Sequence, residues 1–479
     1  MNGFNKRTIT PRHKPKKKLR QWEKKASRWI KGHIILTVII VLLGGFTIKG
    51  VLGAIKMGEP FSVKQIVISA VTKGVETDEY GHTNVLLLGI GGEGHDGEHL
   101  TDTMIVASID HKNNVVPMLS IPRDLYVDNE VVGWGTRLNG VYEFVLEKTE
   151  SHDIAIAELQ GEIESMLGLD IHYYAMIDFQ GFEDIVDAVG GISVDVEYDL
   201  YDPFYPAEAG TGVLYEPFSV SAGTQELNGE SALKYARSRS TTSDFDRARR
   251  QQQVINAIKD KALSLGFLLN PAKIANTFEA ISDNFQTNLE IDEILNLAGM
   301  AGDFSTDSMV SEVLNDLAYE SAGFLYTPDR EEYGGAFVLV PYAESFKELH
   351  MFAQLFFYHP DIYQNQTEIQ VLNGTQTPSL AGLTKMYLHR YGFNIVQFGN
   401  AAEKGVENTM IYVLDEEALK EDETLDLLPS LTFGEITTEI PLEYQAENWT
   451  TDAKIIIELG DDFAEYYDEN PELFYIGFY

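Results

Sequence analysis

The chain has 479 residues, no cysteine and a formal net charge of −38. Its length suffices for two or three domains, and the absence of cysteine excludes disulfide bridges and thiolate metal sites. This negative charge is unevenly distributed along the chain. The first 31 residues carry 12 Lys and Arg against one acid, whereas the rest carries 24 Lys and Arg against 73 Asp and Glu.

The N-terminus combines a basic tail, residues 1–31, with an apolar segment, residues 32–55. About 20 apolar residues span the hydrocarbon core of a bilayer, so we expect one transmembrane helix here. The positive-inside rule places the tail in the cytoplasm and everything after residue 55 outside the cell. A cleavable signal peptide is the alternative, but its basic region would be unusually long and no clear cleavage site follows.

After an expected stalk, residues 56–81, short apolar segments alternate with helical patterns. The predicted strands are 84–89, 103–109, 115–120, 173–178 and 192–197, and the predicted helices are 179–189, 223–236 and 247–265. Residues 271–297 also have a helical pattern. This alternation predicts a layered α/β domain over residues 82–300.

A connecting segment, residues 301–365, leads to a second and smaller α/β unit over residues 366–479. The connecting segment contains an expected strand, 336–340, and an apolar helix, 343–358. The second unit has predicted strands at 368–372, 393–396 and 409–413, a helix at 379–391, a further strand at 454–459 that could close the sheet, and an acidic tail.

Five arginines lie within the fourteen residues 237–250 of this otherwise acidic chain. Such a cluster suggests a bound anion, because each guanidinium offers phosphate two parallel N–H donors. The alternative is a network of ion pairs with the surrounding carboxylates. Arg237 and Arg239 alternate as in an extended segment, so both side chains are expected to project to one side.

The rest of the cluster follows a helical pattern from about Asp246. That helix puts Arg247, Arg250 and Gln251 on one face. Two extended arginines facing this helical set would make a cradle for phosphate. Arg249 points elsewhere, and we expect it to be a solvated charge or to form an ion pair.

Two further candidates stand at the ends of predicted strands. Arg123 follows the strand 115–120, and strand ends are where α/β folds place ligand contacts; pairing with Asp124 or Asp128 alone is the alternative. Asp102 stands where a glycine-rich and acid-rich loop meets the strand 103–109. A carboxylate there is a good ligand for a hard cation such as Mg²⁺ with phosphate oxygens as further ligands.

Together these motifs resemble the LytR-CpsA-Psr family over roughly residues 80–270, and the N-terminal anchor with its basic tail fits the same family. The resemblance is carried, in chain order, by 84–90, Thr101–Thr103, Ser120–Asp124, Leu138–Gly140, Asp187–Val196, Leu227–Arg239 and Asp244–Gln252. Residues 368–413, with Asn373-Gly374 and Gly392-Phe393, resemble the small LytR C-terminal domain that often follows.

The resemblance implies an α-β-α domain with a mixed central sheet, anchored in the membrane by one N-terminal helix. It implies a cell-wall phosphotransferase that takes a glycopolymer from a polyprenyl-pyrophosphate carrier and joins it to peptidoglycan through a phosphodiester, with the lipid in an apolar tunnel. The implied catalytic residues are Arg123, Arg237, Arg239 and Arg247. The implied substrate contacts are Gln251, Arg250 and Asn139, and Asp102 is an implied ligand of Mg²⁺ or Mn²⁺.

The sequence departs from the family at Gly91, which stands where a second metal-binding Asp is usual. Asp96, helped by His95, is our candidate to replace it; a weakened or absent metal site is the alternative.

Two other functions stay open at this stage: a pyrophosphatase that uses water as the acceptor, and a surface protein that binds lipid phosphate or wall glycan without catalysis. Nucleic acid is not an expected partner, because the arginines lie outside the membrane.

Overall fold

The computed structural model describes residues 74–474, apart from residues 96, 208–212, 239–243, 265–283, 291–292, 294–295, 298–308, 317–322, 344–345, 416–418, 420–421 and 446–448. The expected cytoplasmic tail, the membrane helix at 32–55 and most of the stalk lie outside the described residues, as do Asp96 and Arg239. Among the residues described, no helix combines the length and the apolar character that a membrane span needs.

The first domain is built on a mixed six-stranded sheet with the strand order β11-β6-β1-β2-β3-β12. Its strands are β1 (His82–Gly89), β2 (Thr103–Asp110), β3 (Val116–Ser120), β6 (Tyr173–Ile177), β11 (Phe285–Thr287) and β12 (Met309–Val313). Strand β1 runs parallel to β6 and antiparallel to β2, and β3 runs parallel to β12. The expected mixed sheet is therefore confirmed.

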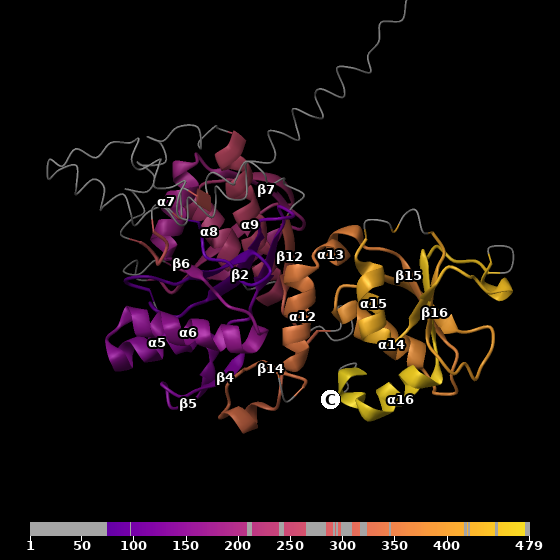
Figure 1. Cartoon of the computed structure of the whole chain (residues 1–479). Coiled ribbons are helices and arrows are strands. Elements are labelled where there is room, and N and C mark those ends of the chain that lie inside the picture. The colour runs from indigo at the N-terminus through magenta and orange to yellow at the C-terminus, as the bar shows by residue number, and fades with distance from the viewer. Residues whose placement is uncertain are drawn as a thin grey trace, which may run out of the picture.

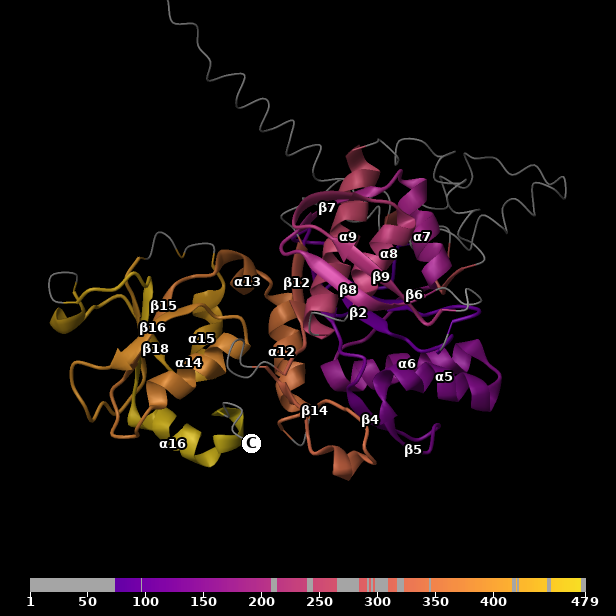
Figure 2. The same cartoon turned by 180° about the vertical axis from the view of Figure 1, so that it is seen from behind.

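Helices cover both faces of this sheet, because its strands are apolar on both sides. Along β1, Leu86 and Leu88 belong to one buried cluster, whereas Val85 and Leu87 belong to another. One face carries α5 (Leu138–Thr149) and α6 (His152–Leu167), and the other carries α7 (Phe179–Ala188), α8 (Gly229–Arg237) and α9 (Asp244–Ser264). Figures 1 and 2 show these two helical layers on opposite sides of the sheet.

Two expected helical segments each contain a short strand, and residues 271–283 of the second segment lie outside the described residues. Residues Gly223–Leu227 form β10, which pairs antiparallel with β7 (Ile192–Val196), and α8 begins only after Asn228, whose side chain caps it. Within the helical pattern at 271–297, β11 pairs antiparallel with β6. In both places pairing with a neighbouring strand overrides the local pattern.

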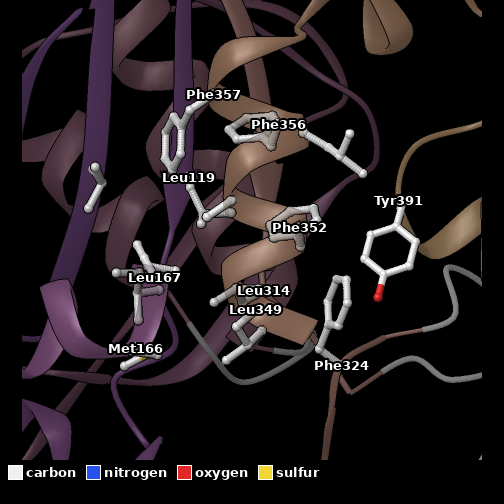
Figure 3. Close-up of a cluster of buried hydrophobic side chains, with 14 of the residues drawn as sticks. Leu119, Met166, Leu167, Leu314, Phe324, Leu349, Phe352, Phe356, Phe357 and Tyr391 are labelled. Carbon is white, nitrogen blue, oxygen red and sulfur yellow. The ribbon is translucent and has the colours of Figure 1, made fainter. Parts of the chain in front are cut away.

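The expected connecting segment contributes to the first domain. Strand β12 extends the central sheet beyond residue 300, and helix α12 (Lys347–Tyr358) covers the sheet beside α6. In Figure 1, α12 lies between the two domains. Its apolar residues point both ways, toward Leu119 and Met166 on one side and toward Phe324 and Tyr391 on the other (Figure 3).

Shorter hairpins and turns complete the first domain. They are β4 (Tyr126–Asn129) with β5 (Trp134–Arg137), β8 (Leu200–Pro206) with β9 (Tyr215–Val220), β13 (Leu325–Tyr326) with β14 (Val340–Pro341), and a 3-10 turn at Arg330–Tyr333. The expected strand at 336–340 is thus reduced to the pair β13–β14 and an isolated bridge.

The second domain is a five-stranded α/β unit with the strand order β16-β15-β19-β17-β18. Its elements are α13 (Asp361–Asn365), β15 (Ile369–Asn373), α14 (Leu380–Arg390), β16 (Ile395–Asn400), β17 (Met410–Val413), α15 (Thr424–Thr432), β18 (Glu435–Thr437), β19 (Ile455–Leu459), α16 (Asp461–Glu469) and 3-10 turns at Leu442–Tyr444 and Pro471–Phe474. Strand β19, expected to close the sheet, is instead its buried central strand. The acidic C-terminal segment forms α16, whose Phe463 is buried.

Candidate active site

The candidate residues of the first domain gather at one edge of the central sheet. Strands β1, β3 and β6 run in the same direction, so their carboxyl ends, at Gly89, Ser120 and Ile177, meet at that edge. The loops that follow these strands carry the glycine-rich segment, Arg123 and Asp178. This is the strand-end location that the sequence predicts for ligand contacts.

An apolar pocket of about 110 Å³ lies between the sheet and helices α7, α8 and α9. Its apolar walls include Leu87, Ile105, Phe182, Ile185, Ile255 and Ile258. Four polar residues also line it: Thr103, Asp178, Arg237 and Gln251. A pocket of this composition suits a ligand with an apolar chain and a polar or anionic head.

Arg237 ends helix α8 and is held against aromatic rings. The central carbon of its guanidinium lies 3.7 Å from the centre of the Phe179 ring, a cation–π distance. Its Nη1 also donates a hydrogen bond of 3.2 Å to the Tyr205 hydroxyl. Stacking uses the face of the guanidinium and leaves its in-plane N–H groups to act as donors.

A second polar cluster surrounds Asp102, immediately before β2. Its Oδ1 accepts hydrogen bonds from Arg123 Nη1, at 2.8 Å, and from Asn139 Nδ2, at 3.2 Å. The backbone N–H of Asn139 donates to the Arg123 carbonyl at 3.1 Å, and Arg123 Nε lies 3.4 Å from Asp124 Oδ2. The structure therefore joins three predicted residues, and Arg123 also makes the ion pair with Asp124 that was the alternative to a ligand contact.

The oxygen atoms in this cluster match part of what a hard cation needs. Asn139 is buried, and its Oδ1 has no hydrogen-bond partner among the described residues. Mg²⁺ is typically bound by one or two carboxylates together with water and substrate phosphate, so Asp102 and Asn139 Oδ1 fit such an ion. Among the described residues, no group of three His, Cys, Asp or Glu side chains could hold a metal ion. An ion bound here would therefore need water or substrate phosphate as further ligands.

The position that departs from the family pattern could take a side chain only if its neighbour His95 shifted by a few tenths of an ångström. A Cβ added at Gly91 would meet His95 Cβ at 3.2 Å as its nearest neighbour. Gly91 is not among the described glycines with a positive φ, whereas the next residue, Gly92, has a φ of 81°. The missing side chain at Gly91 is therefore not a requirement of the backbone.

The arginines of helix α9 differ in burial. Arg249 is exposed and pairs with Asp246 at 2.9 Å, which confirms the expected ion pair. Arg247 and Arg250 are buried, as their shared helix face predicts. Burial lowers the pKa of Arg250, against the opposing effect of nearby Tyr235 and two aspartates.

Arg250 points to helix α8 rather than to the pocket. Its Nε donates to the Tyr235 carbonyl at 3.0 Å and its Nη2 donates to the Ser238 carbonyl. It thereby holds the C-terminal end of α8, whose last residue is Arg237. These two contacts are structural, and the expected contact of Arg250 with substrate stays a prediction. Gln251, by contrast, lines the pocket and donates to Thr103 Oγ1 at 3.0 Å, next to Asp102.

Sequence reasoning missed two residues of this site, Asp178 and Tyr205. Asp178 caps helix α7, its Oδ1 accepting the Gly181 N–H at 2.8 Å, and its Oδ2 would lie 3.0 Å from a Cβ at Gly92. Burial raises the pKa of Asp178. An Asp directly before a helix is an N-cap signal that could have identified it, whereas the contact of Tyr205 with Arg237 depends on the tertiary fold.

Comparison with known proteins identifies the family. The chain matches the LytR_cpsA_psr family over residues 53–333, more than half of its length. It belongs to this family. Residues 366–463 of this LytR-CpsA-Psr protein also match a second family, described as LytR cell envelope-related transcriptional attenuator.

Two similar proteins are a transferase of Bacillus subtilis and a cell wall biosynthesis protein of Corynebacterium glutamicum. The chain is 34% identical over 228 residues to TagV of Bacillus subtilis, named polyisoprenyl-teichoic acid–peptidoglycan teichoic acid transferase; the match covers 47% of the chain and 54% of that relative. It is 26% identical over 423 residues to the cell wall biosynthesis protein LcpA of Corynebacterium glutamicum, covering 81% of the chain and 75% of the relative. The crystal structure of B. subtilis TagV aligns with 59% of the chain and 99% of that structure, at 27% identity and a TM-score of 0.44.

Proposed function

We propose that this LytR-CpsA-Psr protein is a phosphotransferase of the cell wall. It transfers a glycopolymer from a polyprenyl-pyrophosphate carrier to peptidoglycan through a phosphodiester bond. The observation that carries this proposal is the apolar pocket lined by Arg237 and Gln251 beside the Arg123–Asp102 cluster. A prenyl chain and a pyrophosphate match the apolar and polar parts of that site, and the name of the relative TagV supports the same reaction class.

The reaction requires charge neutralisation and positioning more than covalent help from the protein. An acceptor hydroxyl of peptidoglycan attacks the phosphorus that carries the glycan. The hydroxyl loses its proton to solvent, a new P–O bond forms, the bond from that phosphorus to the bridging oxygen breaks, and prenyl phosphate leaves. The pyrophosphate bond drives the transfer, so no nucleotide is needed. Arg237, Arg123, Arg247 and Arg239 neutralise the two phosphates, and Gln251 helps to orient them.

We further propose that Mg²⁺ takes part, held by Asp102 and by the unpartnered Asn139 Oδ1. A bound Mg²⁺ would neutralise phosphate charge at this edge of the sheet. Asp96 is our candidate for a further ligand. An unchanged Mg²⁺ affinity in Asp96→Ala, measured by calorimetry beside Asp102→Ala, would contradict that role.

The N-terminal segment suits a lipid-linked substrate. We propose that residues 32–55 span the cell membrane once, with residues 1–31 in the cytoplasm and both domains outside. Such an anchor keeps the pocket close to a carrier in the same membrane and raises its effective concentration.

The proposal is tested with full-length protein in lipid nanodiscs, a polyprenyl-pyrophosphate glycan and a peptidoglycan acceptor. The product is a glycan–peptidoglycan conjugate with a new phosphodiester, detected by mass spectrometry. Arg237→Ala is expected to reduce its formation by roughly 10²- to 10³-fold, the usual effect of removing one charge-stabilising donor. Arg249→Ala, on the exposed side of α9, is the matched control and should retain activity.

Two outcomes contradict the proposal. Equal activity in Arg237→Ala and wild type would show that the pocket does not take part in the reaction. Release of the glycan as a free phosphate, with no conjugate formed, would identify a pyrophosphatase that uses water as its acceptor.

A further inference from the structure

A second cavity lies where the two domains meet, away from the lipid-phosphate site. It encloses about 140 Å³ between strand β12 of the first domain and α13 and α14 of the second. Its aromatic walls include Phe324 and, from α12, Phe352; their ring centres are 4.8 Å apart, and they lie close together in Figure 3. Its polar lining includes Glu312, Asn315 and Gln366.

Tyr363 gives this cavity a hydroxyl group to which no described residue is hydrogen-bonded. Its Oη is buried and has no hydrogen-bond partner among the described residues. The ring is fixed in place, since it packs edge-on against Phe356 at 5.1 Å and a Cβ at Gly392 would come within 2.4 Å of it. Gly392 has a φ of 93° and no side chain, which allows this approach. A buried, unpaired hydroxyl costs free energy, so it marks a position where a ligand atom can bond.

Glu312 supplies a carboxyl group to the same cavity. Burial raises the pKa of Glu312, against the hydrogen bond from the Val313 N–H. Burial also raises the pKa of Tyr363 well above its usual value, and the nearby Glu312 contributes to this. The Tyr363 phenol is therefore neutral and can both donate and accept.

The cavity is one strand away from the proposed active-site edge. Strand β12 pairs with β3 so that Val313 lies opposite Ser120, three residues before Arg123. Gln252 of α9 donates both to Ser120 Oγ, at 3.0 Å, and to the Glu312 carbonyl, at 3.2 Å. A larger space of about 620 Å³ adjoins the cavity, since Glu312, Tyr363 and Gln366 line both.

We propose that this interdomain cavity binds a saccharide unit of the wall glycan, with Tyr363 Oη and Glu312 bonding sugar hydroxyls and Phe324 and Phe352 packing against the apolar faces of the sugar. The proposal deepens and rests on the transferase function.

Three observations favour a sugar over other ligands. Sugar hydroxyls donate and accept, as the phenol, carboxyl and amides of the lining require. An anionic ligand is disfavoured, because it would lie beside the Glu312 carboxyl group. The guanidinium of Arg390, which also lines the cavity, already binds Glu348 at 3.3 Å and the Leu473 carbonyl at 2.8 Å. The cavity alone would hold roughly five water molecules at about 30 Å³ each, and the adjoining space of about 620 Å³ provides the further room that a hexose unit needs.

The test measures saccharide binding by saturation-transfer NMR and calorimetry on the full-length protein in nanodiscs. One probe is the N-acetylglucosamine–N-acetylmuramic acid disaccharide of peptidoglycan with its lactyl carboxyl capped as an amide, and the other is a neutral hexose disaccharide that represents a carrier-linked polymer. Preference between the two probes identifies the source of the sugar. Tyr363→Phe removes only the unpartnered hydroxyl, so it should weaken binding about three- to tenfold, the effect of one lost hydrogen bond, without lowering the melting temperature.

Tyr412→Phe is the matched control, because the Tyr412 hydroxyl donates to Glu458 at 2.9 Å in the second domain. It should lower the melting temperature and leave saccharide affinity unchanged. Equal saccharide affinity in Tyr363→Phe and wild type, binding of neither probe, or binding of only a stem peptide overturns this inference. Conjugate formation is assayed on the same samples, so that turnover without saccharide binding rejects this site alone, and saccharide binding without turnover rejects the transferase function alone.

Discussion

Neighbouring arginines of helix α9 have different surroundings and should respond differently to substitution. Arg249 is exposed to solvent and pairs with Asp246. Arg250 is buried and donates hydrogen bonds to two backbone carbonyls at the end of α8. The position of Arg237 depends on that end of α8. Arg250 therefore acts on the proposed phosphate site by positioning Arg237.

We expect Arg250→Ala to destabilise the fold by about 2–3 kcal/mol, because hydrogen bonds from a charged donor are lost and buried carbonyls are left without a partner. Denaturant unfolding measures the change. Arg249→Ala, its exposed neighbour, should stay within about 0.5 kcal/mol of wild type. A similar stability for both variants would contradict the assigned role of Arg250.

Gly91 allows a direct test of the proposed metal site. The φ angle of Gly91 permits a side chain, and His95, whose Cβ would lie 3.2 Å from the new Cβ, must shift by a few tenths of an ångström to admit it. If Mg²⁺ binds beside Asp102, Gly91→Asp should add a carboxylate and raise Mg²⁺ affinity by roughly tenfold or more, because affinity rises with ligand charge. Calorimetry measures the affinity, and Gly91→Asn controls for shape without charge. Equal Mg²⁺ affinity in wild type and Gly91→Asp would place the ion elsewhere.

The sequence predicts the composition of the site better than its contacts. Asp102, Arg123 and Asn139 come from three separate motifs, and the structure brings them together. Strand-end geometry made that predictable for Arg123. The inward turn of Arg250 toward α8 and the contact of Tyr205 with Arg237 were not predictable, because both depend on how elements distant in the chain pack.

Among the secondary-structure elements, the first two strands contain a group sensitive to pH. His82 of β1 lies opposite Asp110 of β2, with its Nδ1 3.0 Å from Ser108 Oγ. Burial lowers the pKa of His82 below the ordinary 6.5, and outweighs the attraction of Asp110 and Asp78. The unfolded chain therefore binds this proton more tightly than the folded chain does.

The consequence is a loss of stability in mild acid. The contribution of His82 is fully present above about pH 6.5 and is lost as the pH falls from there toward its lowered folded pKa. The melting temperature should therefore decline between pH 7 and pH 5, and the decline should be shallower in His82→Gln. Parallel curves for the two proteins would show that other groups, such as His152, cause the decline.

Buried strands were the most predictable elements. Strands β1, β2, β3 and β15 are almost entirely buried, and their predicted ranges agree with the structure to within a few residues. The short strands β10 and β11 were not predictable, because their residues lack a buried apolar run and are fixed by pairing with β7 and β6. Chain order also did not reveal that β19 is central, since parallel pairing joins distant segments.

At the scale of the whole molecule, the two domains share one continuous core through α12. The same buried cluster contains Leu119 of the first domain, Phe352 and Phe356 of α12, and Tyr391 of the second (Figure 3). A buried ion pair between Glu348 and Arg390 joins α12 to α14. Interfaces within a chain permit domain motion unless they are large and apolar, and this one is apolar.

The described domains should therefore unfold together rather than in sequence. Phe356→Ala removes a fully buried ring and should cost about 3–5 kcal/mol, lowering a single calorimetric transition. Phe433→Ala, half-exposed on the second domain, is the control and should shift that transition little. Two separate transitions, of which Phe356→Ala moves only one, would mean that α12 belongs to one domain. In that case the interdomain cavity could open independently of the active-site edge.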